Sequence, residues 1–482
     1  MPIEMELKLD TTQAGSDALL AAGIAGDAQN DITLEAVYFD TPDRALHRNG
    51  LSLRIREEDG RAIQAVKAAG GGGGLFTRGE WECTVDGPWP VADPALPIAS
   101  LLGAHFADLA ALFTVRVQRR RRRIEVDGSV IELAIDRGEV LAGERCERFH
   151  EVELELVSGQ RGALFDLARQ FELTAPLRIG VLAKAERGYR LLDALAGAIR
   201  AEPPALSPAM APSAAFAAIV RSCLRQYRLN EEILLRQPAS EPIHQARVAL
   251  RRLRAAFALF KALRDEPESA VLDRGLRDLA RTLGEARDLD VLCRQAPAGA
   301  LRDALAQARE AALPAVAAAL AGPARALMLA LAQWLDEGPW RDPAAGPAAL
   351  PPLPVFAAAA LDRLHRKARR HGRHLARLDD EARHRLRKDA KTLRYAAESL
   401  AGLFDDDRQR RHRKTFLKAL QRLQDALGAL NDSVVAGQRL TAMGLADAPQ
   451  AEALLAAWDH ERLIEEAARA HRALFARKPF WA

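Results

Sequence analysis

Two carboxylates and an ammonium alternate with apolar side chains at the start of the chain. Glu4, Glu6 and Lys8 stand between apolar residues at positions 3, 5, 7 and 9. Because successive strand side chains point to opposite faces, these charged groups project together from one face of a predicted strand. Such a face can hold a hard cation beside an anion. The same alternation is typical of a half-buried edge strand, so one strand alone decides nothing.

The alternation returns in most strand-like segments before residue 180. Charged side chains fall on one face of segments 51–56, 63–68, 78–85, 131–136 and 151–156, and the other face is largely apolar. Three carboxylates on the last of these segments would repel one another unless cations or metals lay opposite. If the sheet closes into a barrel of about eight strands, the charged faces can line its interior, where each carboxylate meets a cation or a bound metal.

Two runs of a single residue type interrupt this pattern. The run Arg119 to Arg123 lies inside a strand pattern that continues to Val126, so some of its guanidiniums must face inward. The run Gly70 to Gly74 is not followed by the Gly-Lys-Ser/Thr of a phosphate-binding loop. A flexible hairpin connection is therefore the better interpretation of the glycines.

Length and charge indicate two unlike regions. The chain has 482 residues, an apolar fraction of 49% and a charged fraction of 28%, which suits a globular protein of two or three domains. Its net charge of +4 divides into −7 for residues 1–200 and +11 for the remainder. A basic half of this size implies a polyanionic partner or substrate, although solvated helix faces could absorb much of the excess.

Cysteine spacing and the N-terminal residues favour a cytoplasmic location. The cysteines are Cys83, Cys146, Cys223 and Cys293. Their wide spacing argues against both a disulfide framework and a zinc site. Acidic residues near the start argue against a targeting segment. The longest apolar stretch, 312–335, is broken by proline and glycine, which predicts buried helices joined by a turn and no membrane span.

The order of these pieces resembles the CYTH family of triphosphate tunnel enzymes over residues 1 to about 195. The matching motifs are Glu4-x-Glu6-x-Lys8, Leu53-Arg54-Ile55-Arg56, Lys67, Glu132-Leu133-Ala134-Ile135-Asp136, Glu151-Val152-Glu153-Leu154-Glu155-Leu156 and Lys184-Ala185-Glu186-Arg187-Gly188-Tyr189. The resemblance implies an antiparallel eight-stranded barrel that binds linear triphosphate with a divalent metal. With the helices expected beyond residue 200, the fold class is α+β. Its members include inorganic and thiamine triphosphatases, class IV adenylate cyclases and RNA triphosphatases. The fold therefore indicates that the substrate is a triphosphate but does not specify which one.

Charge then indicates a role for each candidate residue. Groups expected to bind phosphate oxygens are Lys8, Arg54, Arg56, Lys67, Arg119 and Lys184. Groups expected to hold Mg²⁺ or Mn²⁺ are Glu4, Glu6, Asp136, Glu153 and Glu155. The first strand, with Glu4, Glu6 and Lys8, is the expected catalytic segment, where a second metal or a carboxylate would activate the attacking water.

Residues beyond 200 read as helices. A proline-rich linker at 201–213 precedes an all-α domain at 214–478, with halves at about 214–336 and 355–478 joined by a proline-rich segment. A set of four residues recurs between the halves. His244, Arg247, Arg251 and Arg254 correspond to His384, Arg387, Lys391 and Arg394.

Each recurring set forms a basic stripe on one helix. Offsets of 0, 3, 7 and 10 residues fall within an arc of roughly 80° and span about 15 Å. Like charges at these offsets destabilise a helix, so their presence in both halves indicates a bound polyanion. This half resembles the CHAD family over residues 214 to about 475, which implies two pseudo-symmetric four-helix bundles around a basic groove that binds polyphosphate.

The histidines at 365, 371 and 374 lie among arginines, where either metal binding or a protonatable extension of the groove is conceivable. The leading hypothesis is a metal-dependent inorganic triphosphatase, releasing pyrophosphate and phosphate, joined to a polyphosphate-binding module. The alternatives are thiamine triphosphatase or adenylate cyclase chemistry in the same tunnel, or a non-catalytic polyphosphate or RNA binder. Sparse aromatic residues count against RNA. The sequence leaves the oligomeric state and the choice of metal open.

Overall fold

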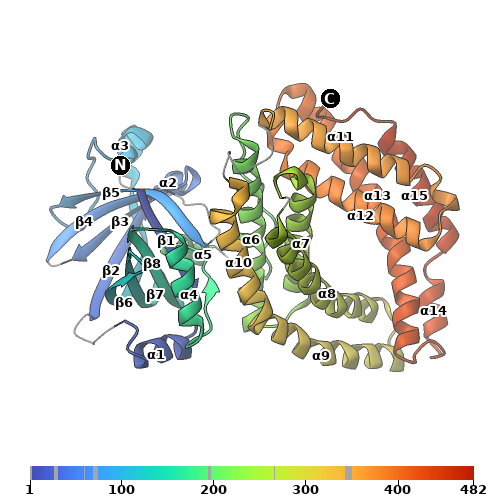
Figure 1. Cartoon of the computed structure of the whole chain (residues 1–482), viewed down its shortest axis with the longest axis horizontal. Helices are drawn as coiled ribbons and strands as arrows, with labels where there is room; N and C mark the ends of the chain where they lie inside the picture. Colours follow the sequence, from blue (N-terminus) through green and yellow to red (C-terminus); the bar gives the residue numbers. More distant parts are fainter. Residues whose placement is uncertain are drawn as a thin grey trace. The chain divides into compact units, whose positions relative to one another are not determined.

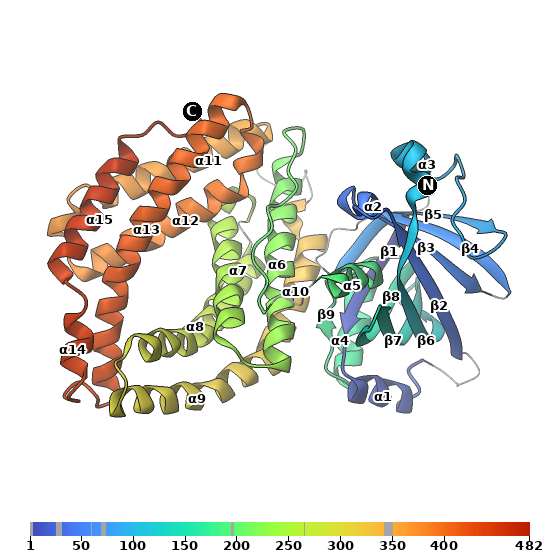
Figure 2. The ribbon, with the colours of Figure 1, turned by 180° about the vertical axis from the view of Figure 1, so that it is seen from behind.

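The computed structural model describes residues 3–25, 31–58, 60–68, 74–193, 197–264, 266–341 and 350–482. Residues 70–73 of the glycine run and 342–349 of the proline-rich connection lie outside these ranges. The chain divides into two compact units, one of residues 1–197 with 325–338 and the other of residues 198–324 with 339–482. Figure 1 and Figure 2 show the elements of both from opposite sides.

The first unit is a closed antiparallel barrel. Its strands are β1 (Ile3–Asp10), β2 (Asp31–Asp40), β3 (Leu51–Glu58), β4 (Arg61–Ala68), β5 (Leu75–Val85), β6 (Ala110–Val126), β7 (Ser129–Ala142), β8 (Arg145–Ser158) and β9 (Arg178–Ile179). The neighbour order is β5-β4-β3-β2-β6-β7-β8-β1, and β1 also pairs with β5. The ring of eight strands is therefore complete, with β9 added beside β1, and the predicted fold class is confirmed.

Strand register brings the charged residues together inside the barrel. Lys8 of β1 is opposite Glu153 of β8, and Arg119 of β6 is opposite Asp136 of β7. The alternate side chains, such as Leu154, are buried on the outer face, where helices α1 (Gln13–Ala21) and α4 (Gly162–Glu172) contact β8. The strand period of two thus separates a charged interior from an apolar outer layer.

Part of the interior is apolar, which the sequence pattern did not predict. Helix α5 (Lys184–Leu192) packs with Tyr38, Val115 and Phe149 in one buried cluster. A Cβ atom at Gly188 of α5 would lie 2.0 Å from the ring of Phe113, so only glycine permits this close packing. The short helices α2 (Ala45–Arg48) and α3 (Pro97–Leu102) belong to the same unit.

The second unit is helical. Its helices are α6 (Pro212–Arg236), α7 (Ser240–Leu259), α8 (Pro267–Gln295), α9 (Ala300–Ala321), α11 (Leu353–His371), α12 (Asp380–Ser399), α13 (Asp407–Ala442), α14 (Ala451–Ala456) and α15 (His460–Phe475). Consecutive helices pack from α6 to α9, and α11, α12, α13 and α15 do so in turn. The halves meet where α7 packs on α12 and α6 on α11. Equivalent helices therefore contact each other, as a two-fold relation requires.

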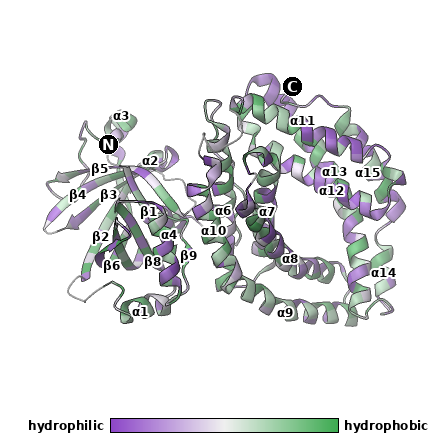
Figure 3. Cartoon of the chain, viewed as in Figure 1, coloured by the Kyte–Doolittle hydropathy of each residue, from purple (hydrophilic) through white to green (hydrophobic). Residues whose placement is uncertain are grey.

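Helix α10 (Pro323–Glu337) groups with the barrel, although the sequence boundaries placed it in the helical half. Its Arg325 pairs with Glu172 of α4 at 2.9 Å. Residues 300–341 are long and apolar enough, by length and composition, to cross a membrane, and α9 is largely hydrophobic in Figure 3. The segment forms two helices that meet at Gly322, so the predicted turn is confirmed. Pro314 does not break α9, and only Leu301, Leu305, Val316 and Leu320 of α9 are buried, so the prediction of buried helices holds only in part.

Candidate active site

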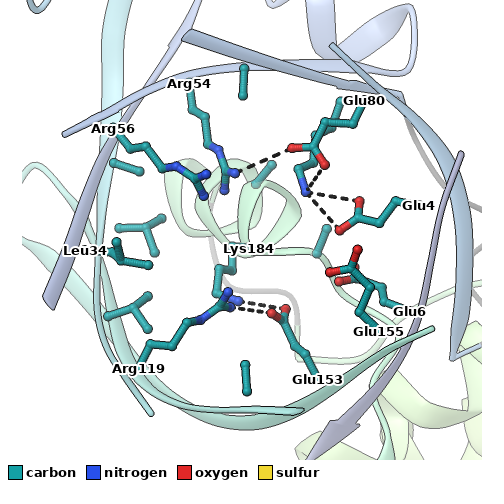
Figure 4. Close-up of a pocket in the computed structure, with 18 of the residues that line it drawn as sticks. Glu4, Glu6, Leu34, Arg54, Arg56, Glu80, Arg119, Glu153, Glu155 and Lys184 are labelled. Atoms are coloured by element: carbon teal, nitrogen blue, oxygen red, sulfur yellow. Dashed lines mark hydrogen bonds and ion pairs between the residues drawn. The ribbon is translucent and has the colours of Figure 1, made fainter. Parts of the chain in front are cut away.

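The barrel encloses a cavity of about 240 Å³ with a charged lining. Its cationic lining residues are Lys8, Arg54, Arg56, Lys67, Arg78, Arg119, Arg121 and Lys184, and its acidic ones are Glu4, Glu6, Glu80, Glu82, Glu132, Glu153 and Glu155. All six predicted phosphate-binding residues thus reach one cavity (Figure 4). Four of the five predicted metal ligands do so too, and Asp136 is fully buried beside it.

One part of the cavity wall is a dense network of ion pairs around Asp136. Arg119 donates from Nε and Nη2 to the two oxygens of Asp136 at 2.7 and 2.6 Å. Lys184 Nζ lies 2.8 Å from both Asp136 and Glu153, and it also contacts Glu151. Although burial acts to raise the pKa of Asp136, Lys184 and Arg119 outweigh it and hold that pKa below its usual range.

Lys8 extends this network to the first strand. Its Nζ contacts Glu153 and lies 3.3 Å from Glu6. Burial alone would lower the pKa of Lys8, but Glu153 and Glu6 raise it above its usual value, so this ammonium stays charged. Lys8, Lys184 and Arg119 are therefore fixed cations whose positions are set by buried carboxylates.

A second group of carboxylates, Glu4, Glu6 and Glu155, has fewer cationic partners than the group around Asp136. Glu4 accepts from Lys67 at 3.1 Å and from Arg78 at 3.3 Å, and Glu6 accepts from Arg78 at 2.7 Å. Within the described ranges the structure gives Glu155 no hydrogen bond or ion pair. Burial, with the nearby charges of Glu4 and Glu6, raises the pKa of Glu155 to about 7. This corner of the cavity therefore carries negative charge that a cation would neutralise.

The acidic residues fit a hard divalent metal unequally. Asp136, Glu151 and Glu153 have carboxylate oxygens within 4.8 Å of one another, but Lys184 contacts all three. Glu155 is free of such competition, and Glu4 and Glu6 are close enough to raise its pKa. Oxygen ligands of this kind suit Mg²⁺ or Mn²⁺. The corner with Glu155 is thus the better fit for a metal.

Sequence reasoning gave no role to several groups on β5. Glu80 lies 3.7 Å from Arg54 and 2.9 Å from Lys67, and Glu82 lies 3.5 Å from Arg56. The alternation in the sequence could have predicted their position, because residues 78, 80 and 82 share one face of the strand. Arg78 was not predicted as a site residue, although it pairs with both Glu4 and Glu6 of β1.

One wall of the cavity is apolar. Strands β2 and β6 contribute Ile32, Leu34, Ala36, Val115 and Val117 to its lining. In Figure 4, Leu34 lies across the cavity from Glu6 and Glu155. A ligand in this cavity would therefore meet charge on some sides and hydrocarbon on another.

In the helical unit, the recurring basic residues meet where α7 packs on α12. Arg251 Nε of α7 donates to the hydroxyl of Tyr395 on α12 at 3.2 Å. Arg247 donates to the Gly284 carbonyl at 2.9 Å and to Asp288 at 3.3 Å. Arg387 lies 3.9 Å from Asp432, a loose pair. We call Arg247, Arg251, Arg387 and Lys391 the groove cations, after the basic groove that the resemblance implies.

The remaining residues of the two recurring sets, two arginines and two histidines, differ in their contacts from one another. Arg254 lies 3.5 Å from Asp273, and Arg394 lies 2.7 Å from Glu398. His384 forms a 2.7 Å hydrogen bond with Asn431. For His244, burial and the neighbouring charges of Arg287 and Arg251 lower the pKa to about 4. The outer arginines are thus paired with carboxylates, whereas the central cations lie mainly among one another.

The three histidines of the 365–374 segment have different surroundings. The ring of His365 packs against Phe416, Phe475 and Trp481. His371 lies 2.6 Å from Asp389. The side chain of His374 is exposed. The segment therefore has one core histidine, one in an ion pair and one at the surface.

Two domain families match the chain, one after the other. The CYTH domain family matches residues 2–189, and the CHAD domain family matches residues 218–441. The chain therefore carries a CYTH domain followed by a CHAD domain, as both resemblances predicted.

An inorganic triphosphatase from Haemophilus influenzae is 31% identical over 199 residues, which are 39% of this chain. The match spans 54% of that protein, or about half the length of this curated relative. The crystal structure of the CHAD domain from the plant Ricinus communis is 30% identical and covers 58% of this chain and 98% of its own, with a TM-score of 0.48. A putative adenylyl cyclase from Hippeastrum, described as having a dominant triphosphatase activity, is 19% identical over 38% of this chain and 93% of its own, with a TM-score of 0.28.

Proposed function

We propose that the barrel hydrolyses inorganic triphosphate to pyrophosphate and phosphate in the cytoplasm, with Mg²⁺ or Mn²⁺, and that the helical domain binds polyphosphate. The observation that carries the enzymatic part is the cavity, in which six predicted phosphate-binding cations lie beside carboxylates, one of which, Glu155, has no hydrogen bond or ion pair among the described residues. The inorganic triphosphatase similar to the barrel supports the same substrate class.

The chain's own residues would bind and orient the phosphates. Lys8, Lys184 and Arg119 are already fixed by buried carboxylates, so little reorganisation is needed when charge develops on the phosphate. Arg54 and Arg56 lie 3.7 and 3.5 Å from Glu80 and Glu82, farther than Arg119 lies from Asp136, and Arg54 also has a hydrogen bond with Tyr38. Their guanidiniums can therefore exchange a glutamate for phosphate oxygens, which they bind in pairs.

The metal would be held by Glu4, Glu6 and Glu155, because this corner has unneutralised charge. When bound, a divalent metal supplies charge neutralisation at the phosphates and lowers the pKa of a bound water. Asp136 and Glu153 were also predicted as metal ligands. Their contacts with Arg119 and Lys184 favour a role in positioning those cations.

The apolar wall favours a second candidate, an organic triphosphate such as thiamine triphosphate or ATP. The test is phosphate release by the full chain from inorganic triphosphate, thiamine triphosphate and ATP, with Mg²⁺ and with Mn²⁺. We expect the largest kcat/KM for inorganic triphosphate. Equal values for all three substrates would exclude the inorganic assignment, and a preference for an organic one would assign the apolar wall to its organic group.

The binding function of the helical domain rests on the groove cations. Four cationic side chains that converge from two helices form a site for a chain of repeated negative charges. The test is direct binding of long-chain polyphosphate to the full chain, followed by competition with RNA of matched charge. Polyphosphate should bind more tightly. Equal competition by RNA would mean that the groove selects charge alone.

A further inference from the structure

Lys391 differs from the other groove cations because its ammonium has no partner. Its side chain is partly buried on α12, and across the described ranges the structure gives it no hydrogen bond or ion pair. Arg251 holds the equivalent position in the first half, and its Nε donates to Tyr395. The two halves thus place different chemical groups at one repeated position, a guanidinium with a partner and an amine without one.

The surroundings of Lys391 are mainly cationic. The charged groups that act on it are Arg387 of α12 itself, Arg247 and Arg251 of α7, and Asp432 of α13. Of these, Asp432 lies within 3.9 Å of Arg387, and Arg247 is paired with Asp288 of α8. From α11, Lys367 and His371 both pair with Asp389, on another part of α12. The charged groups around the amine are therefore one carboxylate, which favours the ammonium, and three guanidiniums, which disfavour it.

This environment disfavours the charged form of the amine. Burial is the largest effect, and with Arg387 and Arg251 it lowers the pKa of Lys391 to about 6. Above that pH the free protein holds Lys391 mostly as a neutral amine. An arginine in the same position keeps its charge, because a guanidinium does not lose its proton in proteins.

We propose that a polyphosphate chain entering the groove causes Lys391 to take up a proton, so that binding weakens as the pH rises. This inference rests on the proposed polyphosphate binding. Phosphate oxygens beside the amine stabilise the ammonium, so the proton is bound more tightly in the complex than in the free protein. It passes from solvent to the lone pair of Nζ, and no covalent bond to phosphate forms.

The sign of the effect follows from linkage. Below about pH 6 Lys391 is charged in both states, and its protonation does not change on binding. Between that pH and the higher pKa in the complex, binding takes up as much as one proton, and the association constant falls by as much as about tenfold per pH unit. His244 starts from a pKa of about 4, so it needs a much larger rise before it contributes near neutral pH.

The experiment is isothermal titration calorimetry of the full chain with long-chain polyphosphate, in chelator to prevent hydrolysis. Buffers of different ionisation enthalpy at pH 7.5 and constant ionic strength give the number of protons taken up. We expect the wild-type protein to take up nearly one proton more than Lys391→Arg, whose guanidinium is already charged. Titration of the polyphosphate ends is common to both and cancels in the difference.

Three further variants separate the contributions. Arg251→Lys, the matched change in the other half, should retain the uptake, and His244→Asn should leave it nearly unchanged. Lys391→Met should show the same small uptake as Lys391→Arg, which guards against a folding defect in either one. If both Lys391 variants take up as many protons as the wild type, the proposal is wrong. If the wild type does not bind polyphosphate at all, the proposed binding function fails instead.

Discussion

The barrel cavity and the groove cations hold positive charge in opposite ways. In the cavity, Lys8, Arg119 and Lys184 each contact at least two carboxylates. In the groove, Lys391 has no such contact among the described residues, and Arg387 has only a loose one. The cavity is therefore organised before its ligand arrives, whereas the groove depends on its ligand for neutralisation.

This difference has a physical reason. A small site whose charges are mostly buried must pair most of them, because an isolated buried charge costs several kcal/mol. Partly exposed cations can remain unpaired because water screens them, and Lys391, where burial dominates, responds by a lowered pKa. The cavity thus suits a short anion bound with a metal, and the groove suits a long anion bound alone.

The largest expected effect is the loss of hydrolysis in Glu6→Gln. This change removes a carboxylate from the corner that fits a metal, so kcat for inorganic triphosphate should fall by at least about 100-fold. Steady-state phosphate release measures it, and polyphosphate binding should be unchanged. The control is Glu35→Gln, at an exposed carboxylate on the barrel. Full activity in Glu6→Gln would remove Glu6 from the site.

The second effect concerns stability. Arg119→Ala removes the two hydrogen bonds that Arg119 donates to the buried Asp136, so the barrel should lose about 3–5 kcal/mol of unfolding free energy. Arg251→Ala loses one hydrogen bond but relieves repulsion, so the helical domain should change by less than about 1 kcal/mol. Calorimetric unfolding of the two variants tests the comparison. Equal destabilisation would contradict the contrast between paired and unpaired charge.

A third prediction concerns binding in the groove. Arg251→Ala combined with Lys391→Ala should weaken polyphosphate binding on the order of tenfold and reduce its salt dependence. Hydrolysis of inorganic triphosphate should stay close to wild type. The control pair, Arg408→Ala with Lys414→Ala, removes two exposed cations of α13. If the control weakens binding as much as the groove pair, binding follows net charge alone.

The smallest expected effect is a gain in stability in Glu155→Gln. Because the fold raises the pKa of Glu155 to about 7, ionisation of this carboxylate costs stability as the pH rises through that range. Without metal at pH 8, the variant should melt a few degrees above the wild type, and at pH 4 the two should agree. Adding Mn²⁺ should stabilise the wild type more. A lower melting temperature for the variant at pH 8 would show that Glu155 has a stabilising partner.

Much of the site followed from periodicity. The alternation in β1 and β8 correctly placed Glu4, Glu6 and Glu153 on the inner face, since one face of a strand is set by a period of two. Arg119 was preferred within its arginine run, and it faces Asp136. The ion-pair partners of these residues could not be predicted from periodicity. Arg78 lies beside Glu4 because β5 closes onto β1, which joins strands far apart in sequence, and Glu80 lies beside Lys67 because β5 pairs with β4.

The apolar wall of the cavity could not be predicted from the sequence for a related reason. Residues such as Leu34 and Val117 have ordinary strand-like apolar character, and nothing local says whether they face the core or the cavity. Only the barrel's curvature and the packing of α5 place them inside.

The sequence by itself determined which residue types share a face, because that depends only on the period of the helix or strand that carries them. It also determined the repeat that puts Arg251 and Lys391 at equivalent positions. Tertiary structure alone decided which charges are neutralised, because pairing depends on register, ring closure and helix packing between distant segments. The contrast between Lys184, surrounded by three carboxylates, and Lys391, surrounded by guanidiniums, therefore appears only in the folded chain.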